Sequence, residues 1–227
     1  MANLYITFIV YLIAACFYIV ADYKNRIKAK FNLRIVLCIS YLCFAIFAFL
    51  LNRVDGKLVA LTHFKWIFAG MVFIFMGDLI LVKKQIDKNF AIGQTAYFIS
   101  QVLFTVYFFI ILFQATGQMI NLREVLIFLG SLIILLLIVG INNGLHMGLL
   151  FLLVTSAVMI AKGSSLIQFM NTSFSWPLFI GVLLLSFSNA ILLYVHHTKK
   201  EYAFSKGLYN VLHMVGIIVM PLGIYFV

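Results

Sequence analysis

The sequence has few charged residues, and this scarcity argues against most kinds of soluble protein. Only 10% of its 227 residues are Asp, Glu, Lys or Arg, and the acidic residues number six. Hydrophobic residues make up 65% of the chain, which is more apolar surface than a soluble domain of this size can bury. The composition therefore predicts an integral membrane protein.

Signatures of soluble enzymes are also absent. The chain contains no GxSxG, HExxH or Walker sequence and no dinucleotide-binding glycine pattern. Its three cysteines lie in apolar runs without CxxC spacing, which is typical of small buried residues. Convergent His and carboxylate side chains are too few to predict a metal site, so we expect no metal and no cofactor.

Long apolar runs are what the sequence has instead. A helix needs about 20 residues to cross a membrane. Runs of this kind extend over Leu4 to Ala21, Arg34 to Leu51, Trp66 to Val82, Phe90 to Phe113, Val125 to Ile141, His146 to Ala161, Pro177 to Val195 and Gly207 to Val227. The sequence predicts an all-α integral membrane protein, a single polytopic domain (residues 1–227) folded as one bundle of about eight transmembrane helices.

The net charge of +10 follows from membrane topology, because cytoplasmic loops collect basic residues. We therefore expect no nucleic acid as a partner. The predicted loops on one side carry Lys24, Arg26, Lys28, Lys30, Arg34, Lys83, Lys84, Lys88, Lys199, Lys200 and Lys206. Those on the other side carry Arg53, Lys57, Lys65, Arg123 and Lys162, with His63. This bias predicts a multi-pass protein of the cell membrane with both termini outside the cytoplasm.

A short repeat suggests an internal duplication. The sequence "GDLIL" at residues 77–81 is echoed by "SNAIL" at residues 188–192, in the third and seventh predicted spans. Parallel repeats of this kind occur in membrane proteins, with sites between the halves. The hypothesis is of two four-helix halves, at about residues 1–115 and 116–227.

One carboxylate interrupts the third apolar run, at Asp78 in "FIFMGDLILV". Burying a charge in hydrocarbon costs several kcal/mol, so such a residue usually faces a cavity or a partner. One interpretation is an aspartate near the interface that pairs with Lys83 or Lys84. The other is a functional carboxylate.

Polar residues at helical spacing favour the second interpretation. They form three stripes: Gln94, Tyr97, Gln101 and Thr105; Ser186, Asn189 and His196; Lys206, Tyr209, Asn210 and His213. Each stripe by itself is explained by hydrogen bonds between helices. Together with Asp78, and with Arg34 at the start of the second span, they predict a polar cavity that opens towards the inner leaflet.

Four segments carry a family resemblance. "GDLIL", "NFAIGQTAYFISQVLF", "LLLSFSNAILL" and "YNVLHMVG" resemble successive motifs of the YhhN-like lysoplasmalogenase family, over the chain from about Arg34 to its end. The resemblance implies hydrolysis of the vinyl ether bond of lysoplasmalogens, or of a related single-chain ether lysolipid. It also implies a catalytic pair of intramembrane aspartates.

The chain departs from this family pattern. Asp78 matches the first aspartate, but Asn189 stands at the position of the second. Gln101 stands where members usually have His, and His213 where they usually have Gln. Arg34 stands at a basic position of the second span. We expect Asp78, Asn189 and His213 to be catalytic, and the substrate to contact Gln101, Tyr97, Arg34 and Tyr209.

Vinyl ether hydrolysis needs a proton donor and a group that activates water. Because burial disfavours a charged carboxyl, Asp78 could stay protonated and act as the acid. Asn189 can hold a water or a hydroxyl but cannot be the base. His213 is the only titratable substitute near that depth. Either His213 has become the base, or the reaction has been lost or changed.

Three functions therefore stay open. The first is a membrane hydrolase whose partners are a lysophospholipid or ether lipid and the surrounding membrane lipids. The second is a catalytically impaired, lipid-binding member of the same family. The third is a small transporter with Asp78 as its ion site, which would need access to both sides of the membrane.

Overall fold

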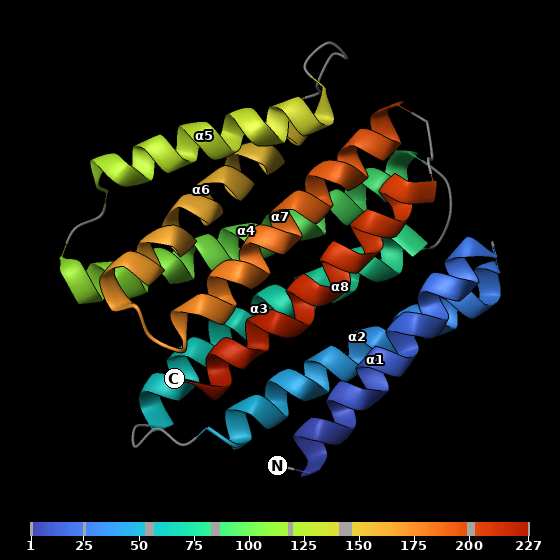
Figure 1. Cartoon of the computed structure of the whole chain (residues 1–227), viewed down its shortest axis with the longest axis horizontal. Helices are drawn as coiled ribbons and strands as arrows, with labels where there is room; N and C mark the ends of the chain where they lie inside the picture. Colours follow the sequence, from blue (N-terminus) through green and yellow to red (C-terminus); the bar gives the residue numbers. More distant parts are fainter. Residues whose placement is uncertain are drawn as a thin grey trace. The chain divides into compact units, whose positions relative to one another are not determined.

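A computed structural model describes residues 2–24, 26–52, 57–82, 87–117, 120–140, 147–198 and 203–226. These residues form eight helices (Figure 1): α1 (Ala2–Tyr23), α2 (Ile27–Leu50), α3 (Lys57–Val82), α4 (Asp87–Thr116), α5 (Leu122–Val139), α6 (Met147–Met170), α7 (Ser175–Thr198) and α8 (Ala203–Tyr225). Each is long and apolar enough to cross a membrane. The predicted all-α, multi-pass architecture is confirmed.

Several helices extend beyond the apolar runs. Helix α2 begins at Ile27 and α6 ends at Met170, so Arg34 and Lys162 lie inside helices. The expected outer-loop position of Lys162 is wrong, and so is that of His63, because α3 already begins at Lys57. The sequence predicts that a span ends at its first charged residue. A membrane helix can nevertheless continue through a charged residue that has a buried partner.

Lys162 shows how such a charge is accommodated. Its Nζ lies 2.6 Å from Oε2 of Glu124, and both side chains are almost fully buried. The ammonium also lies 4.1 Å from the centre of the Phe109 ring. Glu124 is in the first turn of α5, where the Asn121 side chain accepts a hydrogen bond from the Glu124 N–H at 2.9 Å. The ion pair thus ties the start of α5 to α6.

The helices fall into two compact units. The first contains residues Met1–Leu103 with Ile224–Val227, and the second contains Phe104–Gly223. The hypothesis of a duplication into two four-helix halves stays a prediction.

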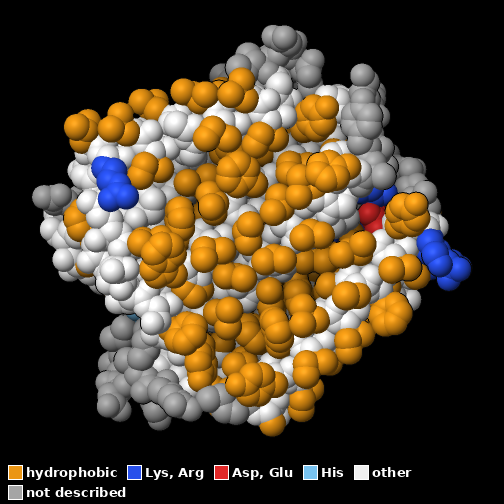
Figure 2. Space-filling view, in the orientation of Figure 1, with side chains coloured by type: hydrophobic (Ala, Val, Ile, Leu, Met, Phe, Trp, Pro, Cys, Tyr) orange, Lys and Arg blue, Asp and Glu red, His pale blue; other side chains and the backbone are white. Residues whose placement is uncertain are grey.

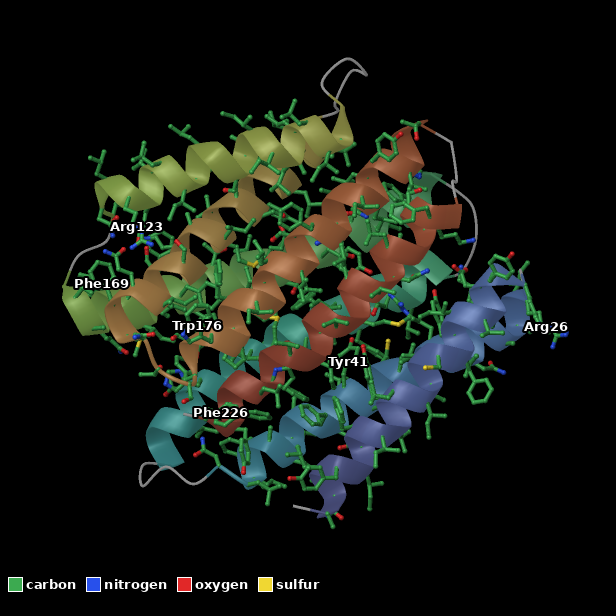
Figure 3. All side chains as sticks on the ribbon, in the orientation of Figure 1. Arg26, Tyr41, Arg123, Phe169, Trp176 and Phe226 are labelled. Carbon is green, nitrogen blue, oxygen red and sulfur yellow. The ribbon has the colours of Figure 1, made fainter. Side chains whose placement is uncertain are left out.

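In the first unit, consecutive helices pack in an antiparallel register. Between α1 and α2, the Phe8 and Phe44 rings are 6.0 Å apart, and Asp22 pairs with Lys30 further along. Between α2 and α3, the Tyr41 hydroxyl (labelled in Figure 3) donates to the carbonyl of Met71 at 3.3 Å. These contacts place the C-terminal ends of α1 and α3 beside the N-terminal end of α2.

Helices α3 and α4 approach closely because glycine lies at their contact. A Cβ added to Gly77 would lie 2.8 Å from a ring carbon of Tyr97, and one added to Gly93 would lie 2.7 Å from Leu81. Small residues of this kind let membrane helices pack by their backbones. Gly77 therefore brings the Tyr97 ring next to the residue that follows it, Asp78.

In the second unit, α7 and α8 make a similar glycine contact. A Cβ at Gly181 would lie 2.3 Å from Met220 Cγ and 3.0 Å from the Gly216 carbonyl oxygen. Nearer the other end of the pair, Ser188 Oγ donates to the carbonyl of Tyr209 at 3.2 Å. Helices α5, α6 and α7 also pack against one another.

The outer surfaces of the helices are apolar. Figure 2 shows one face, on which hydrophobic side chains predominate and charged ones are few. On α1, for example, Tyr5, Ile6 and Phe17 are more than half exposed, and on α5 the same holds for Leu126 and Leu137. Exposed side chains of this kind are suited to lipid rather than water.

The expectation that both termini lie outside the cytoplasm stays a prediction, and the ends of α2 provide its test. Arg26 precedes α2 and points away from the helices (Figure 3), and Leu51 caps the other end. In a chain with Cys16, Cys38 and Cys43 replaced, a membrane-impermeant thiol reagent added outside should label Leu51→Cys but not Arg26→Cys. The reverse pattern would invert the topology.

Candidate functional site

The clearest polar site in the first unit surrounds Asp78, which lies one turn before the end of α3 and is 1% exposed. Its Oδ1 forms an ion pair with Nη2 of Arg34 and accepts a hydrogen bond from the Tyr97 hydroxyl at 2.5 Å. Its Oδ2 lies 3.7 Å from Sγ of Cys38, which donates to it. Helices α2, α3 and α4 thus meet at one carboxylate.

The sequence of α2 explains this convergence. Arg34 and Cys38 are four residues apart, so their side chains lie on the same face of the helix, one turn apart. That face meets α3 in the register that also joins Tyr41 to Met71. The carboxylate of Asp78 therefore receives a donor on each of its two oxygens from a single helix.

Arg34 decides the charge of the site. It is 2% exposed, and a guanidinium keeps its proton in proteins, so its burial needs a negatively charged partner. Asp78 is that partner, and the Tyr18 ring lies 5.2 Å from Cζ of Arg34 on the other side. The geometry favours Asp78 as a carboxylate, which accepts protons or stabilises a cation, over the proton-donating role expected from burial alone.

The sequence-based alternative partners of Asp78 were Lys83 and Lys84, which lie outside the described residues. The partner found is Arg34, which also belongs to the predicted site. Cys38 was missed, because a cysteine in an apolar run was interpreted as a small core residue. Its spacing of four from Arg34 was the signal that could have identified it.

The predicted stripe on α4 is buried at Gln94, Tyr97 and Gln101, and Thr105 is partly buried. Gln101 is 3% exposed, one turn beyond Tyr97. Gln94, one turn before Tyr97, is 6% exposed, and neither Oε1 nor Nε2 of its amide has a hydrogen-bond partner among the described residues. An unsatisfied buried amide is costly, so Gln94 marks a place where a polar ligand would be stabilised.

The other predicted residues lie in the second unit. Asn189 on α7 and His213 on α8 are 5% and 1% exposed, and the rings of Tyr209 and His213 are 5.8 Å apart. Asn210 and Ser186 are also buried. The second unit therefore holds buried polar side chains on both α7 and α8, two helices that the Ser188–Tyr209 hydrogen bond joins.

Two of these α7 side chains have a polar atom without a hydrogen-bond partner among the described residues. Ser188, between them in the sequence, faces α8 through its bond to the Tyr209 carbonyl. Ser186 Oγ and Asn189 Oδ1 have no hydrogen-bond partner within the part of the chain that is described.

The structure thus brings Arg34, Asp78 and Tyr97 together in the first unit, where Gln101 is also found. Asn189, Tyr209 and His213 belong to the second unit. The expectation that all of them line one cavity stays a prediction. Across the described ranges, no three His, Cys, Asp or Glu side chains are grouped closely enough to hold a metal ion.

Comparison with known proteins gives a family. No curated protein and no solved structure matches the chain. The model of the YhhN family matches residues 58–223, well over half of the 227-residue chain. The match includes Asp78, Tyr97, Gln101, Asn189 and His213 and begins after Arg34. Since both the matched length and the eight membrane-spanning helices agree with the resemblance of the sequence motifs, the chain belongs to the YhhN family.

Proposed function

We propose that the protein is a membrane hydrolase that cleaves the vinyl ether bond of lysoplasmalogens or of a related single-chain ether lysolipid. The observation that carries the proposal is the buried carboxylate of Asp78, held by Arg34 and Tyr97 inside helices that cross the membrane. An ionisable group kept at such a cost is a functional candidate. Membership of the YhhN family supports the same activity.

The reaction defines what the site must do. A proton adds to the vinyl carbon remote from the ether oxygen and leaves an oxocarbenium ion. Water then attacks the carbon bonded to oxygen, loses a proton and gives a hemiacetal, which breaks into a fatty aldehyde and the free glycerol hydroxyl. No redox step is involved, so no cofactor is needed.

Asp78 suits the second half of this reaction. A carboxylate close to the oxocarbenium ion stabilises its positive charge, as the carboxylates of glycosidases do, and can accept the proton of the attacking water. Tyr97, which donates to Oδ1, holds the carboxylate in place. Arg34 keeps it ionised.

The initial proton needs a separate donor. The sequence-based candidate for this donor is His213, a buried imidazole of the second unit, and its role stays a prediction. Asn189, whose Oδ1 has no hydrogen-bond partner among the described residues, orients a water molecule or a substrate hydroxyl. Both assignments are tested by substitution below.

One observation favours a second candidate function. Asn189 occupies the position of the second family aspartate, and an amide cannot replace a carboxylate as base or acid. A member that has lost this group would keep the lipid-binding residues without turnover.

An assay with purified protein separates the two functions. Lysophospholipids of equal chain length, with vinyl ether, saturated ether and acyl linkages, are incubated with the protein in neutral detergent. The hydrolase predicts fatty aldehyde from the vinyl ether lipid alone. Binding of all three lipids without aldehyde or fatty acid would support the binding function instead. Uptake of an ion into sealed vesicles, abolished by Asp78→Asn, would favour a transporter.

A further inference from the structure

A second charged pair lies next to the Asp78 site in the first unit. Lys30, in the first turns of α2, forms an ion pair with Asp22 near the end of α1. Asp22 is 5% exposed, whereas the Lys30 side chain is 26% exposed. The mechanism proposed above uses neither residue.

Lys30 and Arg34 lie on the same face of α2 and form a row of two cationic side chains, the cationic ladder. They are four residues apart on α2, and the Tyr18 ring contacts both, with 5.9 Å to Nζ of Lys30 and 5.2 Å to Cζ of Arg34. Exposure of the side chain falls from 26% at Lys30 to 3% at Arg34. The ladder leads from the end of the helix to Asp78.

Gln94 on α4 is a further polar residue of the first unit that the mechanism does not use. It lies on the face of α4 that carries Tyr97, and its neighbour Gly93 contacts both Leu81 and Gly77, the residue that precedes Asp78. Both polar atoms of its buried amide lack partners among the residues described. A ligand that accepts and donates hydrogen bonds would satisfy it.

We infer that Lys30, held against Tyr18, is the subsite that binds the phosphate end of the lysolipid, so that Lys30 selects single-chain lipids that carry a phosphate headgroup. The inference rests on the proposed lysolipid substrate. A glycerol backbone separates the vinyl ether oxygen from the phosphate, a span of the same order as the single turn (about 5.4 Å) between Lys30 and Arg34. A phosphate at Lys30 thus leaves the scissile bond near Asp78.

Asp22 acts here as a positioning residue. An ammonium has three N–H donors, and the bridge to Asp22 engages the group without exhausting them. Without this anchor, a lysine at a helix end extends towards the interface. Asp22 therefore holds the ammonium of Lys30 against Tyr18, where the phosphate can reach its remaining donors.

Binding to two lipids that cannot be hydrolysed tests the inference. The probes are a saturated alkyl ether lysophospholipid and the alkylglycerol of the same chain, which lacks only the phosphate headgroup. Full-length protein in neutral detergent should bind the phospholipid at least ~10-fold more tightly, as expected for a charge-assisted contact. Lys30→Gln should abolish this difference and leave the alkylglycerol affinity unchanged.

Matched variants isolate the role of the charge. Lys30→Arg should keep the preference, and so should Lys28→Gln, which removes an exposed lysine of the same turn. Asp22→Asn should weaken phospholipid binding only. The double variant Asp22→Asn/Lys30→Gln removes both charges, so no unpaired carboxylate is left to unfold the protein, and should bind like Lys30→Gln.

Three outcomes would overturn the inference. The first is equal weakening of both lipids by Lys30→Gln, which would make Lys30 structural. The second is that diacyl phospholipid competes with the lysophospholipid and that this competition depends on Lys30 as strongly as lysophospholipid binding does. Lys30 would then be a general anchor to membrane headgroups. The third is that inorganic phosphate competes with the lysophospholipid in the same Lys30-dependent way. Lys30 would then be a site for the free anion.

Vinyl ether hydrolysis is measured separately on the wild type. Absence of hydrolysis with a Lys30-dependent preference for phospholipid refutes the hydrolase and keeps the subsite. Hydrolysis without a Lys30-dependent preference for phospholipid refutes the subsite and keeps the hydrolase.

Discussion

Asp78→Asn is expected to lower vinyl ether hydrolysis by at least ~100-fold, the usual cost of removing a group that transfers a proton. The substitution keeps the shape of the side chain and one oxygen that can accept from Tyr97, but it removes the negative charge and the oxygen that accepts from Cys38. The oxocarbenium ion then loses its counter-charge, and water loses the group that accepts its proton. Initial rates of aldehyde release from a vinyl ether lysolipid, at saturating substrate, measure this effect.

The same substitution should also destabilise the protein, because it leaves the Arg34 guanidinium buried without its anion. Breaking a buried ion pair from one side typically costs about 3–5 kcal/mol. Glu124→Gln is the matched control, since it breaks the buried pair with Lys162 outside the proposed site. Thermal unfolding should show a loss in both variants, whereas only Asp78→Asn should lose the chemistry.

A double variant separates stability from chemistry. Arg34→Gln/Asp78→Asn removes both charges and should regain part of the stability lost by Asp78→Asn alone. It should remain inactive. If Asp78→Asn, shown to be folded, hydrolyses the lipid at the rate of the wild type, Asp78 is a structural partner of Arg34, and the hydrolase proposal loses its main support.

His213→Ala should reduce hydrolysis by a similar factor, about 100-fold to 10,000-fold, because the proton donor is lost. His63→Ala provides the matched control, since it removes a histidine of α3 that belongs to none of the predicted polar stripes. An unchanged rate in His213→Ala would exclude the imidazole from proton transfer.

Asn189→Asp tests the position where the chain departs from its family. In the His213→Ala background it should restore hydrolysis, because it returns a second carboxyl group that can carry a proton. If instead the wild type is inactive and Asn189→Asp alone is active, the ancestral acid was lost and His213 has not replaced it. If both are inactive while an active relative releases aldehyde, the protein binds lipid without cleaving it.

Much of the architecture could be predicted from residue type alone. Apolar runs of membrane-spanning length fixed the number of spans, because a helix in lipid must satisfy its own backbone and present apolar side chains. The boundaries were less predictable. The charge of Lys162 predicts the end of a span, but a lysine that pairs with a buried glutamate can continue the helix.

The partners of Asp78 could also be predicted only in part. An isolated carboxylate in "FIFMGDLILV" was enough to single out the residue, because its burial demands compensation. Arg34 was expected near it from depth and charge. Cys38 and the Lys30–Asp22 pair were not, since nothing in a linear sequence says which face of α2 meets α1 and which meets α3.

The sequence by itself therefore determined the membrane class, the eight spans, the family and the residue most in need of a partner. Each of these follows from hydrophobicity, charge or motif, which are properties of residues in order. Only the tertiary structure decided that Arg34 neutralises Asp78, that Tyr97 and Cys38 complete the contact, and that Lys30 continues the ladder towards the helix end. These depend on the register between helices, which glycine contacts and side-chain packing set.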